Sequence, residues 1–426
     1  MKKDPIQNEW NRRDFLRDSS LAAIMTLMGG LELKAAEKTD DPGDKPAGPP
    51  VKCAVVGCGP WGREILKSLS TLSNAPVIAV CDTYPAFQRR ALESAPQAKS
   101  FDDYRRVLEQ KDVQAVLVAT PSHLHRQIAV DVLQAGKHLY CEAPLATTLE
   151  DARAIAKAAL AAPKQMFQAG MIFRSNPIHK HVLQFVRTGA MGKNNMLAAQ
   201  WHKKESWRRK APTPERERAI NWRLDASTSI GLMGELGIHS LDIASWYLMA
   251  RPVSVTGFGE VLAWNDGRNV PDTVQAIIEF PGNIRMIYDA TLGNSFGGAC
   301  ETFYGTESAI VIRQNRAWML KETDAPLLGW EVYARKEAFT PTKETGIALV
   351  ANATQLLAQG KEPAETAANS EPPLHYALEE FIANINESKA PSCSPNDAFN
   401  ASVLAIKANE AIFKGATITY ENQWFA

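Results

Sequence analysis

Residues 51–82 read VKCAVVGCGPWGREILKSLSTLSNAPVIAVCD, and this stretch decides the fold. The pattern predicts a buried strand, a tight turn, a helix, and a second buried strand that ends in an acid, Asp82. Three glycines at the turn form a GxGxxG motif: Gly57, Gly59 and Gly62. Such glycines permit a tight turn, close approach of a pyrophosphate to the backbone, and close packing of helix on strand. The N-terminus of the helix would offer free N–H groups to the phosphates.

Asp82 follows the second strand, at the place where a carboxylate holds a ribose 2′-hydroxyl. We therefore predict a dinucleotide site that contains the three glycines, Pro60, Trp61 and Asp82. Because a carboxylate repels a 2′-phosphate, Asp82 favours NAD. Arg89 and Arg90 on the next helix leave NADP as the alternative.

The alternation of strands and helices continues to about residue 172. Further strands are predicted at 115–119, 138–142 and 166–171, and helices at 86–93, 101–109, 125–134 and 149–160. This order predicts a doubly wound parallel sheet, which binds ligands at the carboxyl ends of its strands. The residues that we expect to bind the cofactor at or just beyond these ends are Thr120, Pro121, His125, Glu142 and Pro144.

Beyond residue 173 the pattern becomes β-rich and predicts a mostly antiparallel sheet. The predicted strands are 196–202, 252–264, 273–280, 284–292, 301–304 and 309–312, with a hairpin turn at 280–283. The predicted helices are 178–188, 231–249, 348–359, 374–386 and 396–413. The fold class is therefore α/β over residues 51–172, followed by α+β over residues 173–426.

The N-terminal segment is predicted to be a targeting signal. Residues 11–17 read NRRDFLR, a twin-arginine pattern, and an apolar run at 21–33 follows that is too short for a confident membrane span. We expect an export signal over residues 1–36, with an uncleaved anchor as the alternative, then a linker over 37–50 and a periplasmic or otherwise exported protein. Because this route carries folded proteins, the cofactor would be loaded before export and should be held tightly.

Composition excludes several classes of protein. The 426 residues contain 47 Lys+Arg and 47 Asp+Glu, so no overall charge points to nucleic acid. The six cysteines form no CxxC motif and read as small buried residues, without a disulfide framework or a metal site.

A candidate catalytic group lies in GELGIHSLD, residues 234–242. On a helix, Glu235 and His239 share a face, as do His239 and Asp242. His239 has the right chemistry to accept or donate a proton near neutral pH. The alternative is a partly buried histidine that its helical neighbours satisfy. A metal site is less favoured because no third ligand lies at ligand spacing.

From residue 51 to about residue 289 the chain resembles the Gfo/Idh/MocA family. The matching segments are GCGPWG with Asp82, ATPSHLH, LQAGKHLYCEAPLA, QAGMIFRSNP and GELGIHSLDIASW. The resemblance implies a Rossmann domain joined to an open-faced β-sheet domain, and a homo-oligomer, either dimer or tetramer. It also implies an enzyme that uses NAD(P) to oxidise or reduce a carbinol of a sugar or polyol.

The resemblance also implies roles for residues of the second half. His239 matches the catalytic histidine, and Glu235 takes a position usually held by aspartate. We expect Arg174 and Asn176 to lie near the substrate, with Asp242 as a further substrate-binding candidate.

One position departs from the family pattern. A lysine usually follows the acid that corresponds to Glu142 and helps to bind substrate, but here Ala143 carries neither charge nor hydrogen-bond donor. We hypothesise that Lys203 or Lys204 replaces it. The tryptophans of the same segment, Trp201 and Trp207, with Trp222 and Arg223 close behind, would suit a wall on which a sugar ring stacks. A solvent-exposed loop is the alternative for the two lysines.

Three functions are consistent with this sequence. The first is an exported, cofactor-retaining NAD(P)-dependent oxidoreductase acting on a sugar, polyol or glycoside. The second is a redox-neutral NAD-dependent glycoside hydrolase similar to relatives that depart from the lysine motif. The third is a non-catalytic sugar- or cofactor-binding protein.

Overall fold

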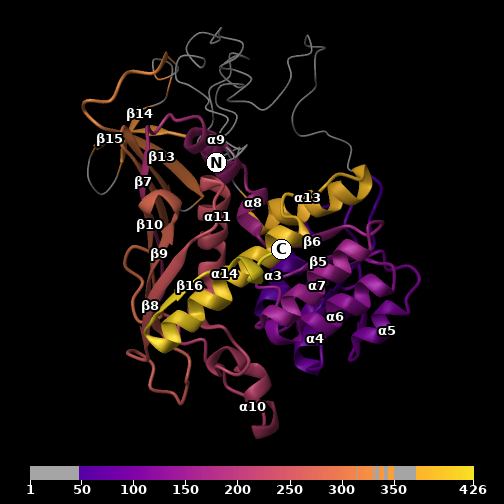
Figure 1. Ribbon diagram of the computed structural model, residues 1–426. Coiled ribbons are helices and arrows are strands. Elements are labelled where there is room, and N and C mark those ends of the chain that lie inside the picture. Colours follow the sequence, from indigo (N-terminus) through magenta and orange to yellow (C-terminus); the bar gives the residue numbers. More distant parts are fainter. Residues whose placement is uncertain are drawn as a thin grey trace, which may run out of the picture. The chain divides into compact units, whose positions relative to one another are not determined.

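The computed structural model describes residues 48–313, 315–329, 331, 334, 336–339, 344–349 and 371–426 (Figure 1). The predicted export signal, most of the predicted linker and most of the helix predicted at 348–359 lie outside these residues. The chain divides into two compact units. Of the described residues, one unit contains 48–176, 197–301 and 371–426, and the other contains those within 177–196 and 302–349. The domain boundary predicted at residue 172 stays a prediction.

The first unit contains a six-stranded parallel sheet, as the sequence predicts. Its strands are β1 (Cys53–Val56), β2 (Val77–Cys81), β3 (Lys99–Phe101), β4 (Ala115–Val118), β5 (His138–Cys141) and β6 (Phe167–Ala169). They are ordered β3-β2-β1-β4-β5-β6, so the direction of winding reverses between β1 and β4. The loops that follow β1 and β4 therefore meet at the switch point, where doubly wound folds bind ligands.

The connecting helices follow the predicted order. They are α3 (Pro60–Leu69), α4 (Pro85–Ser94), α5 (Tyr104–Leu108), η1 (Ser122–Leu124), α6 (His125–Gln134), α7 (Leu149–Ala161) and α8 (Ile172–Ser175). The helix predicted at 101–109 is too long at its start. Phe101 pairs with Cys81 in the sheet, and the Asp103 side chain accepts a hydrogen bond from the N–H of Arg105, which caps α5.

The C-terminal helices of this unit are α13 (Pro373–Glu387) and α14 (Pro395–Lys414). Helix α13 returns to the parallel sheet (Figure 1), where Phe381 lies edge-on to Tyr140 with ring centroids 5.7 Å apart. The side-chain amide of Gln168 donates to the carbonyl of Ala377 at 2.9 Å. Helix α13, near the C-terminus, therefore packs into the core of the six-stranded parallel sheet.

The same unit contains an antiparallel group of strands: β8 (Ser254–Glu260), β9 (Thr273–Phe280), β10 (Ile284–Thr291) and β16 (Thr417–Thr419). Strands β9 and β10 form the predicted hairpin around η4 (Pro281–Asn283). The remaining elements are α10 (Pro214–Ile220), η2 (Trp222–Leu224), η3 (Met233–Gly237), α11 (Ile238–Leu248) and η6 (Asn422–Trp424).

The second unit contains α9 (Pro177–Arg187), β12 (Ser308–Arg313), β13 (Arg316–Lys321), β14 (Lys336–Phe339) and β15 (Glu344–Ala348). Its strands pair antiparallel as β12 with β13, β13 with β15, and β15 with β14. Strands β7 (Asn194–His202) and β11 (Ala299–Gly305) pass from one unit into the other. The sheet is therefore mostly antiparallel, as predicted, although the sequence did not reveal β13–β16.

Two general features complete the fold. No helix within the described ranges is long and apolar enough to cross a membrane. All six cysteines are free; five are buried and Cys300 is half-buried.

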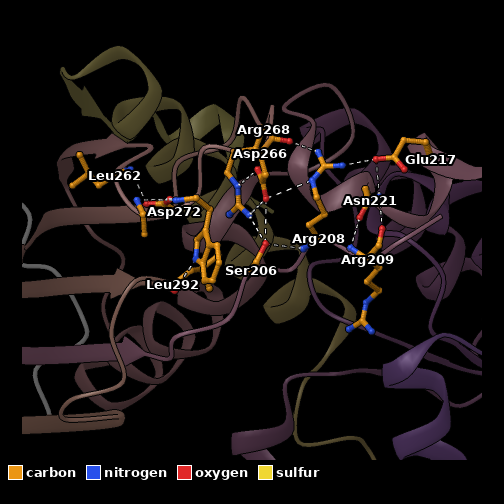
Figure 2. Close-up of polar contacts among 12 residues, drawn as sticks. Ser206, Arg208, Arg209, Glu217, Asn221, Leu262, Asp266, Arg268, Asp272 and Leu292 are labelled. Atoms are coloured by element: carbon orange, nitrogen blue, oxygen red, sulfur yellow. Dashed lines mark hydrogen bonds and ion pairs between the residues drawn. The ribbon is translucent and has the colours of Figure 1, made fainter. Parts of the chain in front are cut away.

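Strand β8 ends earlier than predicted because the loop after it folds around Asp272. This fully buried carboxylate accepts hydrogen bonds from the backbone N–H groups of Leu262, Ala263 and Trp264 at 2.8–3.0 Å (Figure 2). Burial opposes ionisation, but the three N–H bonds outweigh it and lower the pKa of Asp272.

Replacement of Asp272 by Ala is expected to lower the free energy of unfolding by about 2–4 kcal/mol, because three buried donors lose a charged acceptor. Urea unfolding at neutral pH measures this. Asp112→Ala, which changes a carboxylate with 79% of its side chain exposed, is the control and should be close to neutral. Equal urea-unfolding midpoints for the two variants would contradict the stabilising role of Asp272.

Candidate active site

The glycine turn after β1 has the shape that a dinucleotide requires. Gly57 has φ of +92°, and a Cβ there would lie 2.6 Å from the backbone nitrogen of Thr120. A Cβ at Gly62 would overlap the carbonyl oxygen of Gly57, whereas one at Gly59 would meet nothing within 4 Å. Gly59 also lies at the N-cap of α3, where no side chain accepts from the first N–H groups. The turn is closed by packing on one side and open at Gly59, which fits a bound pyrophosphate.

Asp82 lies directly beside this turn. Its carboxylate accepts from the backbone N–H of Cys58 and of Tyr84, both at 2.8 Å. Burial raises the pKa of Asp82, and the two N–H bonds act in the opposite direction. The acid at the end of β2 is thus fixed against the glycine turn, where it can hold a ribose hydroxyl.

His125 is buried between two loops. Only 1% of it is exposed, and its ring nitrogens lie 3.0 Å from the carbonyl of Pro144 and 2.9 Å from the carbonyl of Thr120. His125 thereby ties together the loops after β4 and β5 and holds Thr120 and Pro144 in place. Its direct contact with the cofactor stays a prediction.

Glu142, at the end of β5, is a buried acid. Burial raises its pKa to about 7, while the Trp61 indole, the Ala143 N–H, the Tyr140 hydroxyl and the charge of Arg223 act in the opposite direction. A Cβ at Gly170 would lie 2.5 Å from the Glu142 carboxylate, so glycine leaves room for the acid.

The raised pKa of Glu142 makes stability depend on pH. Between the ordinary value of 4.5 and about 7, the folded state binds this proton more tightly than the unfolded state. The contribution of Glu142 to the free energy of unfolding is therefore fully present below pH 4.5. It is lost as the pH rises through 7, which lowers the free energy of unfolding by about 3 kcal/mol in total. In cofactor-free protein, Glu142→Gln is expected to flatten this fall between pH 5 and pH 8. Parallel stability profiles for the two proteins would contradict the assignment.

The helix that carries Glu235 and His239 begins with a π-helical turn, η3, that continues into α11. Turns of this type occur often at functional sites. Glu235 is buried in η3; it accepts from the Ser122 hydroxyl at 3.2 Å, and its carboxylate lies 3.4 Å from Nε of Arg223. Burial raises the pKa of Glu235, and Arg223 and Ser122 oppose this.

His239 is half-buried on the first turn of α11, edge-on to Phe173 with ring centroids 5.5 Å apart. Ser122 follows β4 and Phe173 follows β6, so the helix that carries both candidate catalytic residues lies against the strand-end loops. The chain therefore brings Glu235 and His239 to the same edge of the sheet as the glycine turn.

Three residues predicted to bind substrate lie inside the protein. Arg174 and Asp242 form a buried pair with two hydrogen bonds of 2.8 Å, and Arg174 also lies 3.4 Å from Asp397 at the start of α14. Asn176 has no exposed surface. Arg174 and Asp242 thus join α8, α11 and α14, and the substrate-binding assignments of the three residues stay predictions.

The two lysines expected to replace the missing one are exposed. Lys203 pairs with Glu205 at 2.6 Å, with 59% of its side chain exposed, and the backbone N–H of Lys204 donates to Ser295. In the part of the chain that the structure describes, neither contacts another candidate site residue. The solvent-exposed alternative is favoured for both.

Residues 203–228, which we call the arm, bring an arginine and two tryptophans to Glu235; sequence reasoning did not predict the contact between Arg223 and Glu235. Arg223 lies beside Glu235, with its guanidinium 4.5 Å from the ring of Trp222 and 5.6 Å from that of Trp207. Trp222 in turn lies 6.0 Å from His123, whose ring nitrogen is 3.2 Å from the Thr228 carbonyl. Both tryptophan rings lie against Arg223, and the stacking of a sugar on Trp222 stays a prediction.

Figure 2 shows how the arm is held. The carboxylate of Asp266 accepts from Arg268 at 2.6 and 2.8 Å and from Ser206 at 3.1 Å, and Arg208 donates to its carbonyl at 2.6 Å. The hydrogen bond from Arg268 lowers the pKa of Asp266 to about 2 despite partial burial. In the same view, the guanidinium of Arg209 points away from this network.

Comparison with known proteins agrees with this architecture. Residues 51–170 match the family described as "Oxidoreductase family, NAD-binding Rossmann fold" (GFO_IDH_MocA), and residues 179–311 match "GFO/IDH/MocA C-terminal domain". Inositol 2-dehydrogenase of Salmonella typhimurium is 28% identical over 200 residues, which are 46% of this chain and 54% of that protein. This match thus spans about half the length of the relative. Inositol 2-dehydrogenase of Burkholderia multivorans is 27% identical over 302 residues, 70% of this chain and 82% of that protein.

Solved structures share the fold. An oxidoreductase domain protein from Kribbella flavida superposes with a TM-score of 0.70 at 20% identity, covering 88% of this chain and 100% of that one. Levoglucosan dehydrogenase in complex with NADH and L-sorbose gives a TM-score of 0.70 at 19% identity, covering 88% and 99%. Both family matches and the fold lead to one conclusion: the chain belongs to the Gfo/Idh/MocA family of oxidoreductases, with an NAD-binding Rossmann domain over residues 51–170.

Proposed function

We propose that this protein is an NAD-dependent oxidoreductase that acts on a carbinol of a sugar or polyol. The main support is the placement of Glu235 and His239 on a helix that contacts Ser122 and Phe173, beside the strand ends that frame the glycine turn. The inositol and levoglucosan dehydrogenases to which the chain is similar act on molecules of this class.

The residues have separable tasks in such a reaction. Bound NAD would supply the hydride acceptor. The backbone at Gly59 would hold the phosphates of the cofactor. The carboxylates of Asp82 and Glu142 would hold its ribose hydroxyls. His239 accepts the proton of the reacting hydroxyl, with Glu235 as a nearby negative charge that stabilises the imidazolium. Trp222 offers an aromatic face to the sugar ring.

One assay separates this function from the other two. Purified protein is incubated with a panel of inositols, aldoses, levoglucosan and aryl glycosides, with and without added NAD. Formation of a keto-sugar, together with an equal amount of NADH or with consumption of an electron acceptor, supports the proposal. Free reducing sugar without net NADH would identify a redox-neutral glycosidase, and binding without turnover would identify a binding protein.

We also propose that the protein retains its cofactor, and the arm supports this. Arg216 on α10 donates to the carbonyl of Thr83 at 2.7 Å and to its hydroxyl at 3.2 Å, and its guanidinium lies 5.5 Å from the Tyr84 ring. These contacts join the arm to the loop directly after Asp82. The arm thus connects the Trp222 wall to the ribose-binding end of the site, which would slow release of a bound dinucleotide.

Arg216→Ala is expected to speed NAD dissociation by about 10-fold, because two hydrogen bonds and a cation–π contact are lost. The measurement is the dinucleotide content of the protein after gel filtration, together with the rate of exchange against labelled NAD. Arg218→Ala changes an arginine of the same arm whose side chain is 72% exposed, and it should retain cofactor like the wild type. Equal cofactor retention in both variants would argue against this role of Arg216.

Export by the twin-arginine route is part of the same proposal, on the strength of the NRRDFLR segment at residues 11–17. Replacing Arg12 and Arg13 together by Lys should leave the protein in the cytoplasm, as shown by cell fractionation. Unchanged export of this variant would exclude the twin-arginine route.

A homo-oligomer is proposed from the outer face of the antiparallel strands. Phe258 on β8, Ile277 on β9 and Ile287 on β10 are 60%, 49% and 45% exposed, and Ile277 and Ile287 are direct cross-strand partners. Adjacent exposed apolar residues of this kind mark an interaction surface. Analytical ultracentrifugation of the wild type and of Ile277→Lys tests this, with dissociation expected for the variant.

A further inference from the structure

Two buried acids of the candidate site share one cation. Glu142 and Glu235 come from different parts of the chain, and burial raises the pKa of both. The charge of Arg223 opposes this shift at each acid, and its Nε lies 3.4 Å from the Glu235 carboxylate. The residue next to Glu142, Ala143, carries no charge. Within the described residues, the cation that acts on both acids is Arg223, which belongs to the arm.

Neighbouring aromatic rings hold the Arg223 side chain in place. Its guanidinium lies against the rings of Trp222 and Trp207, which restricts it and limits its contact with water. About 40% of the side chain stays exposed, so the group has donors left for a ligand. Among the described residues, the charge of Arg223 acts on Glu235, Glu142 and Arg209.

We propose that Arg223 is the substrate-facing cation of this site, taking the place left by Ala143. This inference rests on the proposed function. Arg223 donates hydrogen bonds to the reacting oxygen and stabilises the negative charge that develops there as His239 takes the proton. Because a guanidinium does not lose its proton, Arg223 also favours the ionised form of Glu235, against the burial that raises the pKa of this acid.

The test compares Arg223→Ala, Arg223→Lys and the double variant Ala143→Lys/Arg223→Ala, with Arg218→Ala as the control from the same arm. For a substrate found with the panel above, Arg223→Ala is expected to lower kcat/KM by about 100-fold, as for loss of one donor to a developing oxyanion. Arg223→Lys should retain more activity, and Ala143→Lys should restore part of it. In Arg223→Ala, the acidic limb of the pH profile should move to higher pH, because Glu235 loses its cation.

A second measurement does not depend on turnover. A double-mutant cycle of Arg223→Gln and Glu235→Gln, measured by thermal unfolding at pH 7, should show coupling. The double variant should lose less stability than the sum of the losses in the two single variants. If no sugar or polyol is turned over by the wild type, the proposed function fails while the cycle still decides on the Arg223–Glu235 pair. Wild-type kcat/KM in Arg223→Ala, additive effects in the cycle, or no restoration by Ala143→Lys in a folded protein would overturn the proposal.

Discussion

Replacement of His239 by Asn is expected to lower kcat by about 1,000-fold, within the range that general acid–base catalysis contributes. Asn has nearly the same hydrogen-bonding capacity but cannot accept a proton at neutral pH. His239 lies on the first turn of α11, against Phe173 and one turn beyond Glu235, and none of these residues belongs to the glycine turn. NAD affinity and thermal stability should therefore change little.

The matched control is His375→Asn. His375 lies on α13 with its ring nitrogen 3.1 Å from the Thr71 hydroxyl, beyond the C-terminal end of α3 and thus at the opposite end from the glycine turn. This variant should keep wild-type kcat. The decisive measurements are kcat, NAD affinity by fluorescence titration, and the melting temperature. A His239→Asn protein that binds NAD and turns over at the wild-type rate would exclude His239 as the proton acceptor.

Local patterns predicted the parallel half of the molecule well. The GxGxxG turn and the apolar runs around it depend on neighbours within about 30 residues, so sequence spacing is close to spatial arrangement. The hairpin at Pro281–Asn283 was predicted for the same reason. Strands β13–β15 were missed because β13 mixes large and charged residues, as in RAWMLK, without clean alternation.

The site depends on contacts between segments far apart in the sequence, and these were not readable. Nothing near residue 223 shows that Arg223 lies beside Glu235, nor does the segment 122–125 show that Ser122 donates to the same acid. Residue type also did not reveal burial: Arg174, Asp242 and Asn176 have the polarity of substrate ligands, and the structure buries all three. A buried Arg–Asp pair and an exposed one have the same sequence pattern.

Substitutions in the glycine turn should separate folding from cofactor binding. In Gly62→Ala, the new Cβ would overlap the carbonyl oxygen of Gly57, which is backbone and cannot move without displacing β1 or α3. We expect a loss of more than about 3 kcal/mol in the free energy of unfolding, in the upper range for overpacking. Cofactor binding should be lost together with stability.

Gly59→Ala, three residues before Gly62 in the same turn, is the matched variant. Its Cβ would meet nothing within 4 Å in the protein, and Gly59 has φ of −61°, which alanine adopts readily. The fold should therefore be retained, with a melting temperature within a few degrees of wild type. The methyl group would occupy the open side of the turn, where the pyrophosphate needs to approach, so NAD affinity is expected to fall by about 100-fold or more. Wild-type NAD affinity in a folded Gly59→Ala protein would show that the phosphates bind elsewhere, whereas equal destabilisation of both variants would show that the open side of the turn is part of the packed core.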